Sequence, residues 1–231
     1  MMVPHLSGTF GLIIVGVALL GFGVGYALNR IAARMSQTLL EDALHGETMP
    51  LSVGGRSRRL VPLVCAVLSA LLAGRYGLEW KTLWCLLLLW ALLTLVLIDL
   101  DTLLLPDRLT LPLLWGGLLI NSFGALTDLQ SAVWGAMMGY LLLWAVYWLY
   151  WWITHREGLG YGDFKLLAGL GAWFGWQALP PVLLLASFTG VVTGLFWLWR
   201  GGYSRHTPMA FGPFLAAAGY GVMLWGEGGL P

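Results

Sequence analysis

Charged side chains are scarce in this sequence, and that scarcity is the first constraint on its fold. Only 10% of the 231 residues are Asp, Glu, Lys or Arg, whereas a soluble domain carries about 25%. With a formal net charge of +1 and no basic patch among its aromatic residues, the chain lacks a nucleic-acid-binding signature. Its 59% of hydrophobic residues exceeds what one soluble core needs, which predicts several membrane spans.

Cysteine is rare as well. The chain contains Cys65 and Cys85, and each lies inside an apolar run. It has no CxxC pair, no HExxH motif and no His-rich tract, so we expect no metal site. A disulfide between the two cysteines is the less favoured interpretation, and small buried core residues are the favoured one.

Eight apolar segments predict an all-α, polytopic membrane protein with about eight transmembrane helices in a single membrane-embedded domain, residues 1–231. The N-terminus lacks the basic region of a secretory signal, so we expect the first segment to be retained as a span. Several segments, notably the second and sixth, are shorter than the ~20 residues of an upright span. The segments are residues 10–29, 60–73, 83–98, 109–126, 132–153, 164–176, 181–199 and 211–225.

The basic residues predict an orientation in the membrane. If the N-terminus lies outside, the inward connections hold 10 of the 12 Lys and Arg residues, and only Arg75 and Lys81 face outward. The longest polar stretch, residues 30–59, is then a cytoplasmic loop, within which residues 38–44 have the composition of a short surface helix. The same orientation puts four aspartates on the cytoplasmic side: Asp99, Asp101, Asp107 and Asp163.

Asp99 and Asp163 each lie at the edge of an apolar segment. A carboxylate at membrane depth costs about 2.5–3.5 kcal/mol, so it needs a compensating role. Two carboxylates a few ångströms apart do not both ionise, and such a pair can hydrolyse a peptide bond. One member takes a proton from water while the other donates a proton to the carbonyl oxygen. The dipole at a helix start favours the charged form of Asp163, whereas the apolar helix ended by Asp99 favours its neutral form.

These aspartates also have structural interpretations. Capping of a helix by Asp163 is as well supported by its neighbours as catalysis is. Asp107 suits a helix N-cap, and Asp101 is expected to face water or Arg108. Asp99 is the deepest of the three along its apolar run, so it is the preferred catalytic candidate.

Two glycines and a lysine flank Asp163. Gly160 and Gly162 lack a Cβ, so an extended substrate could lie close to the backbone there. Lys165 either anchors the interface, binds a substrate carboxylate or modulates Asp163.

Ordered motifs in this chain resemble those of the bacterial type IV prepilin peptidases, which are membrane aspartic proteases of the GxGD type. I-D-x6-P-D-x-L-T-L-P runs from Ile98 to Pro112, and G-Y-G-D-F-K-L-L runs from Gly160 to Leu167. Residues 25–29 and 211–214 match as well. The resemblance implies that Asp99 and Asp163 are the catalytic pair. We expect supporting or substrate-binding roles for Gly160, Gly162, Lys165, Asp101, Pro106 and Asp107.

The resemblance implies cleavage of the basic leader of type IV prepilins or type II secretion pseudopilins at the cytoplasmic face of the inner membrane. Proteolysis needs no cofactor, and the other expected partner is membrane lipid. Many members also methylate the new N-terminus with S-adenosylmethionine. Longer members carry two CxxC pairs in the first loop, whereas residues 30–59 contain no cysteine. The chain therefore resembles a short-loop subgroup, in which zinc binding is not expected and methylation stays open.

Two other functions compete with the peptidase. An ion- or proton-coupled transporter would use Asp99 and Asp163 as relay groups. Both lie at segment edges rather than at the midplane, and no paired broken segments indicate an inverted repeat. A scaffold without catalysis is the third function, and the presence of both motif aspartates gives it no support.

Overall fold

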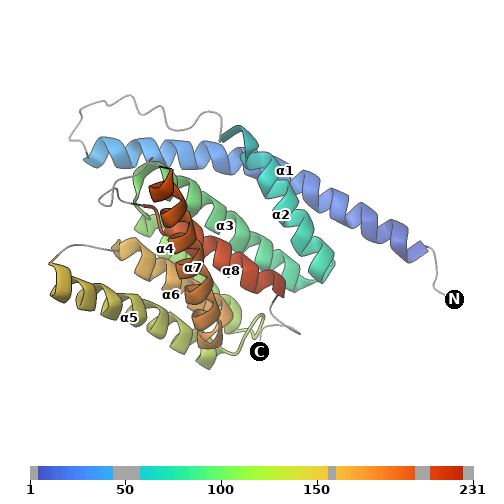
Figure 1. Cartoon of the computed structure of the whole chain (residues 1–231). Coiled ribbons are helices and arrows are strands. Elements are labelled where there is room, and N and C mark those ends of the chain that lie inside the picture. Colours follow the sequence, from blue (N-terminus) through green and yellow to red (C-terminus); the bar gives the residue numbers. More distant parts are fainter. Residues whose placement is uncertain (1–4, 44–57, 156–159, 201–208, 226–231) are drawn as a thin grey trace. The chain divides into compact units, whose positions relative to one another are not determined.

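A computed structural model describes residues 5–43, 58–155, 160–200 and 209–225, and within them every regular element is helical. Two short 3-10 helices, η1 (Arg58–Leu60) and η2 (Trp176–Ala178), accompany the α-helices drawn in Figure 1. The α-helices are α1 (His5–Ala43), α2 (Val61–Tyr76), α3 (Trp80–Thr102), α4 (Asp107–Asn121), α5 (Leu129–Thr154), α6 (Tyr161–Phe174), α7 (Leu179–Trp199) and α8 (Gly212–Trp225).

Each of the eight expected apolar segments coincides with one of these helices, which confirms an all-α membrane protein. Among the described residues, five helices are long and apolar enough to cross a membrane: α1, α2, α3, α5 and α7. The second segment is longer than expected, because η1 and α2 together form a 19-residue candidate span, Arg58–Tyr76. α4, α6 and α8 are shorter, with 15, 14 and 14 residues.

α1 continues well beyond the span expected at residues 10–29. It ends at Ala43, so the first part of the predicted loop, 30–59, is helical, and residues 38–43 of the predicted surface helix 38–44 are the end of α1 rather than a separate helix. Residues 30–43 contain neither Pro nor Gly and are rich in Ala, Arg, Met and Leu, which are good helix formers. The rest of that loop, up to residue 57, lies outside the described residues.

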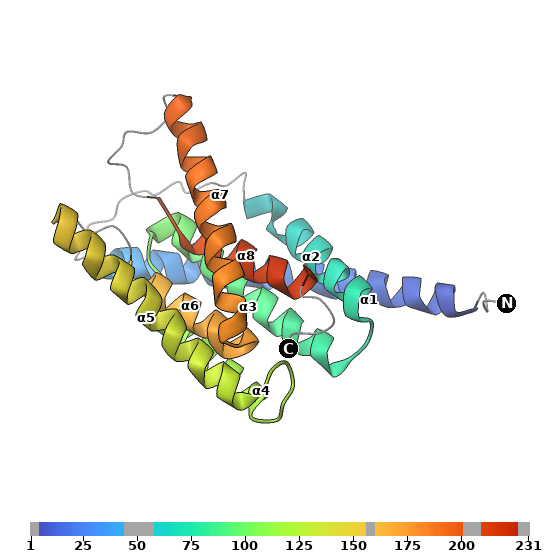
Figure 2. The ribbon, with the colours of Figure 1, turned by 60° about the horizontal axis from the view of Figure 1, so that its bottom comes forward.

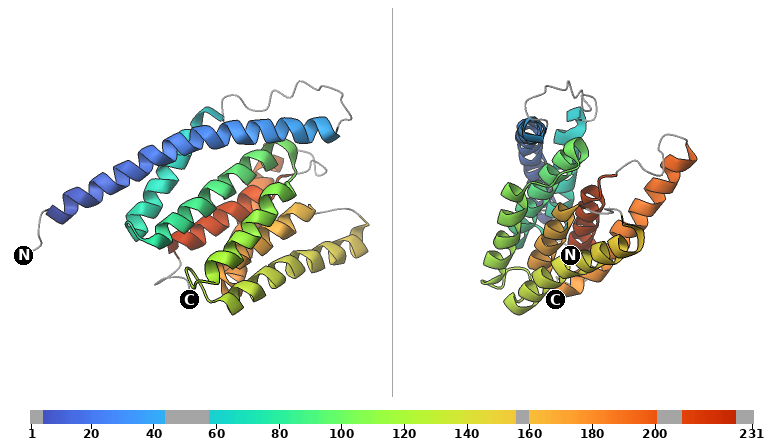
Figure 3. Two further views of the ribbon diagram at one scale, coloured as in Figure 1. Left: turned by 180° about the vertical axis from the view of Figure 1, so that it is seen from behind. Right: turned by 90° about the vertical axis from the view of Figure 1, so that its left-hand side faces the viewer.

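The chain divides into two compact units, Met1–Thr102 and Leu103–Pro231. The prediction of a single domain stays a prediction. In the first unit α1 packs along α2 and α3, and Figure 3 shows this long helix against its two neighbours. Gly21 and Gly25, four residues apart on α1, permit the approach: a Cβ on Gly25 would lie 2.8 Å from Pro62 Cα, inside normal contact.

The two cysteines lie within this first unit. Both are buried and free, which confirms the interpretation as core residues and rules out a disulfide between them. Cys65 faces Gly25 of α1, and its helix neighbour Ser69 accepts a hydrogen bond from Trp90 Nε1 of α3 at 3.2 Å. The small side chains of α2 therefore fill the space between α1 and α3.

In the second unit, α6 is the central helix, and α5 runs beside it (Figure 2). Every residue of α6 from Asp163 to Phe174 except Lys165 is buried. Glycines of α5 make room for it: a Cβ on Gly135 would lie 2.7 Å from the Gly171 carbonyl carbon, and one on Gly139 would lie 2.7 Å from the Leu167 oxygen. α6 therefore packs backbone against backbone with its neighbour.

Asn121 joins the end of α4 to the end of α6. Its buried side chain donates to the carbonyl oxygens of Ala172 and Trp173, at 2.8 and 3.0 Å, and accepts from the backbone N–H groups of Leu126 and Thr127. These four bonds satisfy polar groups that a helix end would otherwise leave unpaired. They explain why α4 ends at Asn121, although the apolar sequence continues toward residue 126.

Two adjacent glycines of α4 provide a test of this packing. A Cβ on Gly117 would lie 2.6 Å from Trp173 Cδ1 and 2.9 Å from the Ala172 carbonyl carbon, whereas one on Gly116 would find only an ordinary contact at 3.8 Å. We expect Gly117→Ala to lower the free energy of unfolding by about 1–3 kcal/mol, the usual cost of overpacking. Gly116→Ala should leave it unchanged or raise it, because Ala is the better helix former. Unfolding of the purified protein in detergent measures both, and equal effects would contradict the packing described.

Candidate active site

Asp99 lies in the last turn of α3, and its residue is only 4% exposed. It is the deepest of the aspartates expected near this helix end, in agreement with its choice as the catalytic candidate. Thr102 closes the helix by donating its hydroxyl to the Ile98 carbonyl oxygen at 2.8 Å.

Asp101, two residues further on, has a different environment from the one expected. Its carboxylate forms an ion pair with Arg58 of η1 and accepts a hydrogen bond from the Ser36 hydroxyl of α1 at 3.0 Å. With a side chain only 7% exposed, it does not face water, and its charged partner is Arg58. That expectation was wrong because Arg58 lies 43 residues away in sequence, and the sequence pattern gives no sign of the contact.

Asp163 is the third residue of α6 and is 6% exposed. The N-cap position belongs to Gly160, whose extended backbone precedes the helix, so the interpretation of Asp163 as an N-cap was wrong. A carboxylate in the first helical turn is stabilised as an anion by the partial positive charge of the helix start. That Asp163 is the ionised member of the pair stays a prediction.

The start of α4 packs against the start of α6 within the second unit. A Cβ on Gly162 would lie 2.6 Å from the Cβ of Leu105, so the absence of a side chain at Gly162 permits this contact. The close neighbour of Gly162 in the structure is Leu105. The expected contact of Gly162 with an extended substrate stays a prediction. Gly160 is exposed, and a Cβ on it would make only ordinary contacts, the nearest at 3.6 Å from Asp163 Oδ2.

An ion pair holds the same two helix starts together. Lys165 of α6 donates to Asp107, which is the first residue of α4 and has a side chain 57% exposed. Pro106 is buried and takes the N-cap position, so Asp107 is one residue past the position expected for it. This ion pair with Asp107 is none of the three roles considered for Lys165, and those three stay predictions.

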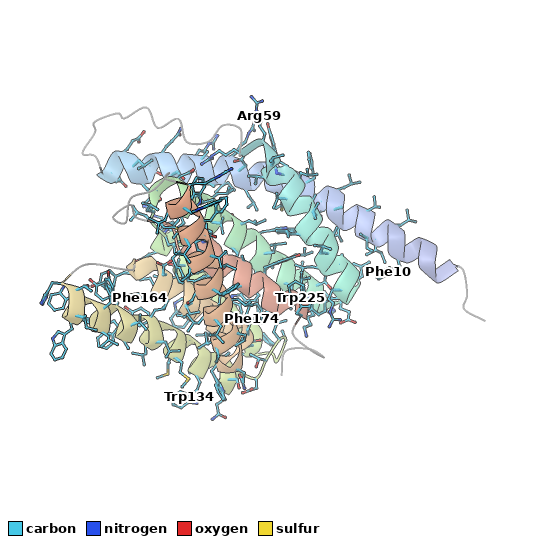
Figure 4. The ribbon with its side chains drawn as sticks, viewed as in Figure 1. Phe10, Arg59, Trp134, Phe164, Phe174 and Trp225 are labelled. Atoms are coloured by element: carbon cyan, nitrogen blue, oxygen red, sulfur yellow. The ribbon has the colours of Figure 1, made fainter. Side chains whose placement is uncertain are left out.

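Aromatic rings from α5 cover the α6 turn that carries Asp163, and sequence reasoning did not identify them. The ring of Phe164, the next residue, lies 5.8 Å from Tyr147 and 5.9 Å from Tyr140, centre to centre. Tyr161 completes the cluster at 5.2 Å from Tyr147. Figure 4 shows Phe164 and Phe174 at the two ends of α6. The seven-residue spacing of Tyr140 and Tyr147, which puts both on one face of α5, was the signal in the sequence.

The two candidate catalytic residues belong to different units, so their pairing stays a prediction. Asp99 shares its unit with Asp101, and Asp163 shares its unit with Gly160, Gly162, Lys165, Pro106 and Asp107. Within the described residues, no group of three or more His, Cys, Asp or Glu side chains could hold a metal ion.

Residues 86–195 match the model of the type IV leader peptidase family. This stretch contains Asp99, Asp163 and all six supporting positions. Over this stretch the chain is similar to that family. The motifs by which the sequence resembled the prepilin peptidases therefore mark a true relationship.

Curated relatives carry the name prepilin leader peptidase/N-methyltransferase. The protein from Stutzerimonas stutzeri is 53% identical over 168 residues, which cover 73% of this chain and 58% of the relative. The protein from Aeromonas salmonicida strain A449 is 54% identical over the same shares. The one from Pseudomonas aeruginosa is 50% identical over 75% of this chain and 60% of the relative. This chain thus matches less than two thirds of their length. No solved structure matches it.

The Gly162–Leu105 contact predicts unequal effects at two glycines. Gly162→Ala should lower the free energy of unfolding by about 1–3 kcal/mol, because its Cβ meets Leu105 Cβ. Gly160→Ala is the matched control and should behave like the wild type. Leu105→Gly removes the opposing Cβ, so the double variant should lose less stability than the two single losses added together. The free energies of unfolding are measured in detergent. If the losses of the two single variants simply add in the double variant, Leu105 is not the residue that the new Cβ at position 162 meets.

Proposed function

We propose that this chain is a membrane aspartic endopeptidase that removes the leader from type IV prepilins or type II secretion pseudopilins. The observation that carries the proposal is the burial of two aspartates at helix ends, Asp99 and Asp163, both inside the family region 86–195. Buried acids at such positions are candidates for catalysis rather than for solubility. The names of the relatives support the choice of substrate.

The helix ends suggest the division of labour between the two acids. Asp163, in the first turn of α6, is the ionised member and takes a proton from the attacking water. Asp99, in the last turn of α3, is the protonated member and donates to the oxygen of the scissile carbonyl. When the tetrahedral intermediate collapses, its C–N bond breaks, Asp163 passes its proton to the leaving amine, and Asp99 recovers a proton from the hydroxyl of the intermediate. Both acids return to their starting states.

Placement at the cytoplasmic face of the inner membrane is part of the same proposal. It is supported by the concentration of Lys and Arg in the inward connections, because basic residues stay on the cytoplasmic side during insertion. The basic leader of a substrate would stay on that side for the same reason. The scissile bond would then lie at the cytoplasmic interface of the membrane.

Transport and N-methylation are the other activities considered for this chain. A transporter would need relay carboxylates inside the membrane, and no observation favours it, since both aspartates lie at helix ends. N-methylation of the cleaved product is part of the relatives' names and would require S-adenosylmethionine. The proposed cleavage uses water as its nucleophile and proceeds without that cofactor.

Replacement of either aspartate tests the dyad. Asp99→Asn and Asp163→Asn should each abolish cleavage of a pilin-like substrate, while the protein still accumulates in the membrane, because neither role is possible for an amide. Glu79→Gln makes the same chemical change at an exposed position at the other end of α3 and should leave cleavage intact. Asp107→Asn should have a milder effect. Near-normal cleavage by either dyad variant would exclude this assignment.

Metal removal tests the mechanism separately. EDTA should leave leader cleavage unchanged, because the proposed step needs two carboxylates and water, and the described residues include no group that could hold a metal ion. Loss of cleavage in EDTA, reversed by added zinc, would show that the reaction is metal-dependent.

A further inference from the structure

The last turn of α3 carries two acidic residues, of which Asp101 is held as an anion in an ion pair. Asp99 and Asp101 both lie in it, and the turn, which the structure describes in full, contains no basic residue. Carbonyl groups at the end of a helix lack intrahelical partners and carry partial negative charge, so carboxylates beside them are destabilising. A cation from another segment is needed to keep this turn helical.

Arg58 of η1 supplies that cation. Its guanidinium forms the ion pair with Asp101, and its Nη1 also donates to the Asn29 carbonyl oxygen of α1 at 3.2 Å. Asn29 returns a hydrogen bond from its side-chain Nδ2 to the Arg58 carbonyl oxygen at 3.1 Å. Arg58 is therefore fixed to α1 through both its side chain and its backbone.

Ser36 adds a second connection from α1, since its hydroxyl donates to the same Asp101 carboxylate oxygen. The contacts among Arg58, Asn29, Ser36 and Asp101, called here the α3 brace, thus join α1, η1 and the end of α3. The Asp101 side chain is 7% exposed and that of Arg58 is 18% exposed. Removal of one partner from such a sheltered pair leaves the other as an uncompensated charge, which is strongly destabilising locally.

We propose that Arg58 is a positioning residue for Asp99 and acts on it through Asp101. Asp99 and Asp101 share one helical turn, so a shift of the Asp101 backbone also moves Asp99. General acid catalysis tolerates little misplacement, and a shift of about 1 Å can cost about 10²-fold in rate. The inference rests on the proposed peptidase function for its kinetic part and on the α3 brace for its structural part.

Direct binding of substrate by Arg58 is the competing role. It is disfavoured because the guanidinium is already engaged with Asp101 and with the Asn29 carbonyl group. The two roles differ in kinetics: a positioning residue changes kcat, whereas a residue that binds substrate equally in the ground and transition states changes KM.

The experiment uses the purified full chain in detergent with a pilin-like substrate. Arg58→Met should lower kcat by about 10²-fold with KM nearly unchanged. Arg58→Lys keeps the charge and should restore part of kcat. Arg58→Met combined with Asp101→Asn removes the stranded carboxylate and should also recover part of kcat. Arg59→Met is the matched control, because Arg59 is exposed and points away from the helices (Figure 4), and it should behave like the wild type.

Hydrogen–deuterium exchange of the same variants gives a readout independent of activity. Arg58→Met should speed exchange in residues 99–102 and leave the first half of α3 protected. The Arg59→Met control should change exchange in neither region. A raised KM at unchanged kcat, or exchange at residues 99–102 that is unaffected by Arg58→Met, would overturn the inference. If the wild-type chain cleaves no leader, the proposed function fails, and the exchange result still decides whether Arg58 holds this turn.

Discussion

A carboxylate buried in an apolar protein loses most of its hydration, and Asp99 and Asp163 are both in that condition. The surrounding structure reflects this constraint. Both residues lie in terminal helical turns rather than in helix interiors, so the helix dipole acts on their charge state in opposite directions. In each case the residue two positions later is held by an ion pair: Asp101 by Arg58, and Lys165 by Asp107. Each candidate acid therefore lies in a turn that is fixed by a neighbouring charge.

Packing in the second unit depends on the absence of side chains. In a membrane, helices are not driven together by exclusion of water, so close contact between backbones has to provide the attraction. Gly135 and Gly139 of α5 allow α6 to approach within a distance that no Cβ would permit. The few buried polar groups, such as Asn121, are used at helix ends, where unpaired carbonyl and N–H groups need them.

The sequence alone predicted where the α-helices of the described residues lie, because apolar runs separated by polar residues are a strong signal. It also singled out Asp99 and Asp163, since aspartate is costly in such runs, and both are buried in the structure; their catalytic role stays a prediction. It failed where the relevant partner is distant along the chain. Asp101 and Arg58 are 43 residues apart, and Lys165 and Asp107 are 58 apart, so neither pair leaves a local pattern. It also missed the extension of α1, because a polar helix lacks the apolar run by which the spans were recognised.

The shortness of α6 has a consequence for the lipid around this protein. Its 14 residues measure about 21 Å along the axis, at 1.5 Å per residue. The hydrocarbon core of a bilayer is about 30 Å thick, so an embedded α6 falls about 9 Å short of crossing it. The first turn, with Asp163, then meets water only where the bilayer thins or the protein surface is indented. Acyl-chain length in the host membrane thereby becomes a variable that controls how much water reaches the aspartate.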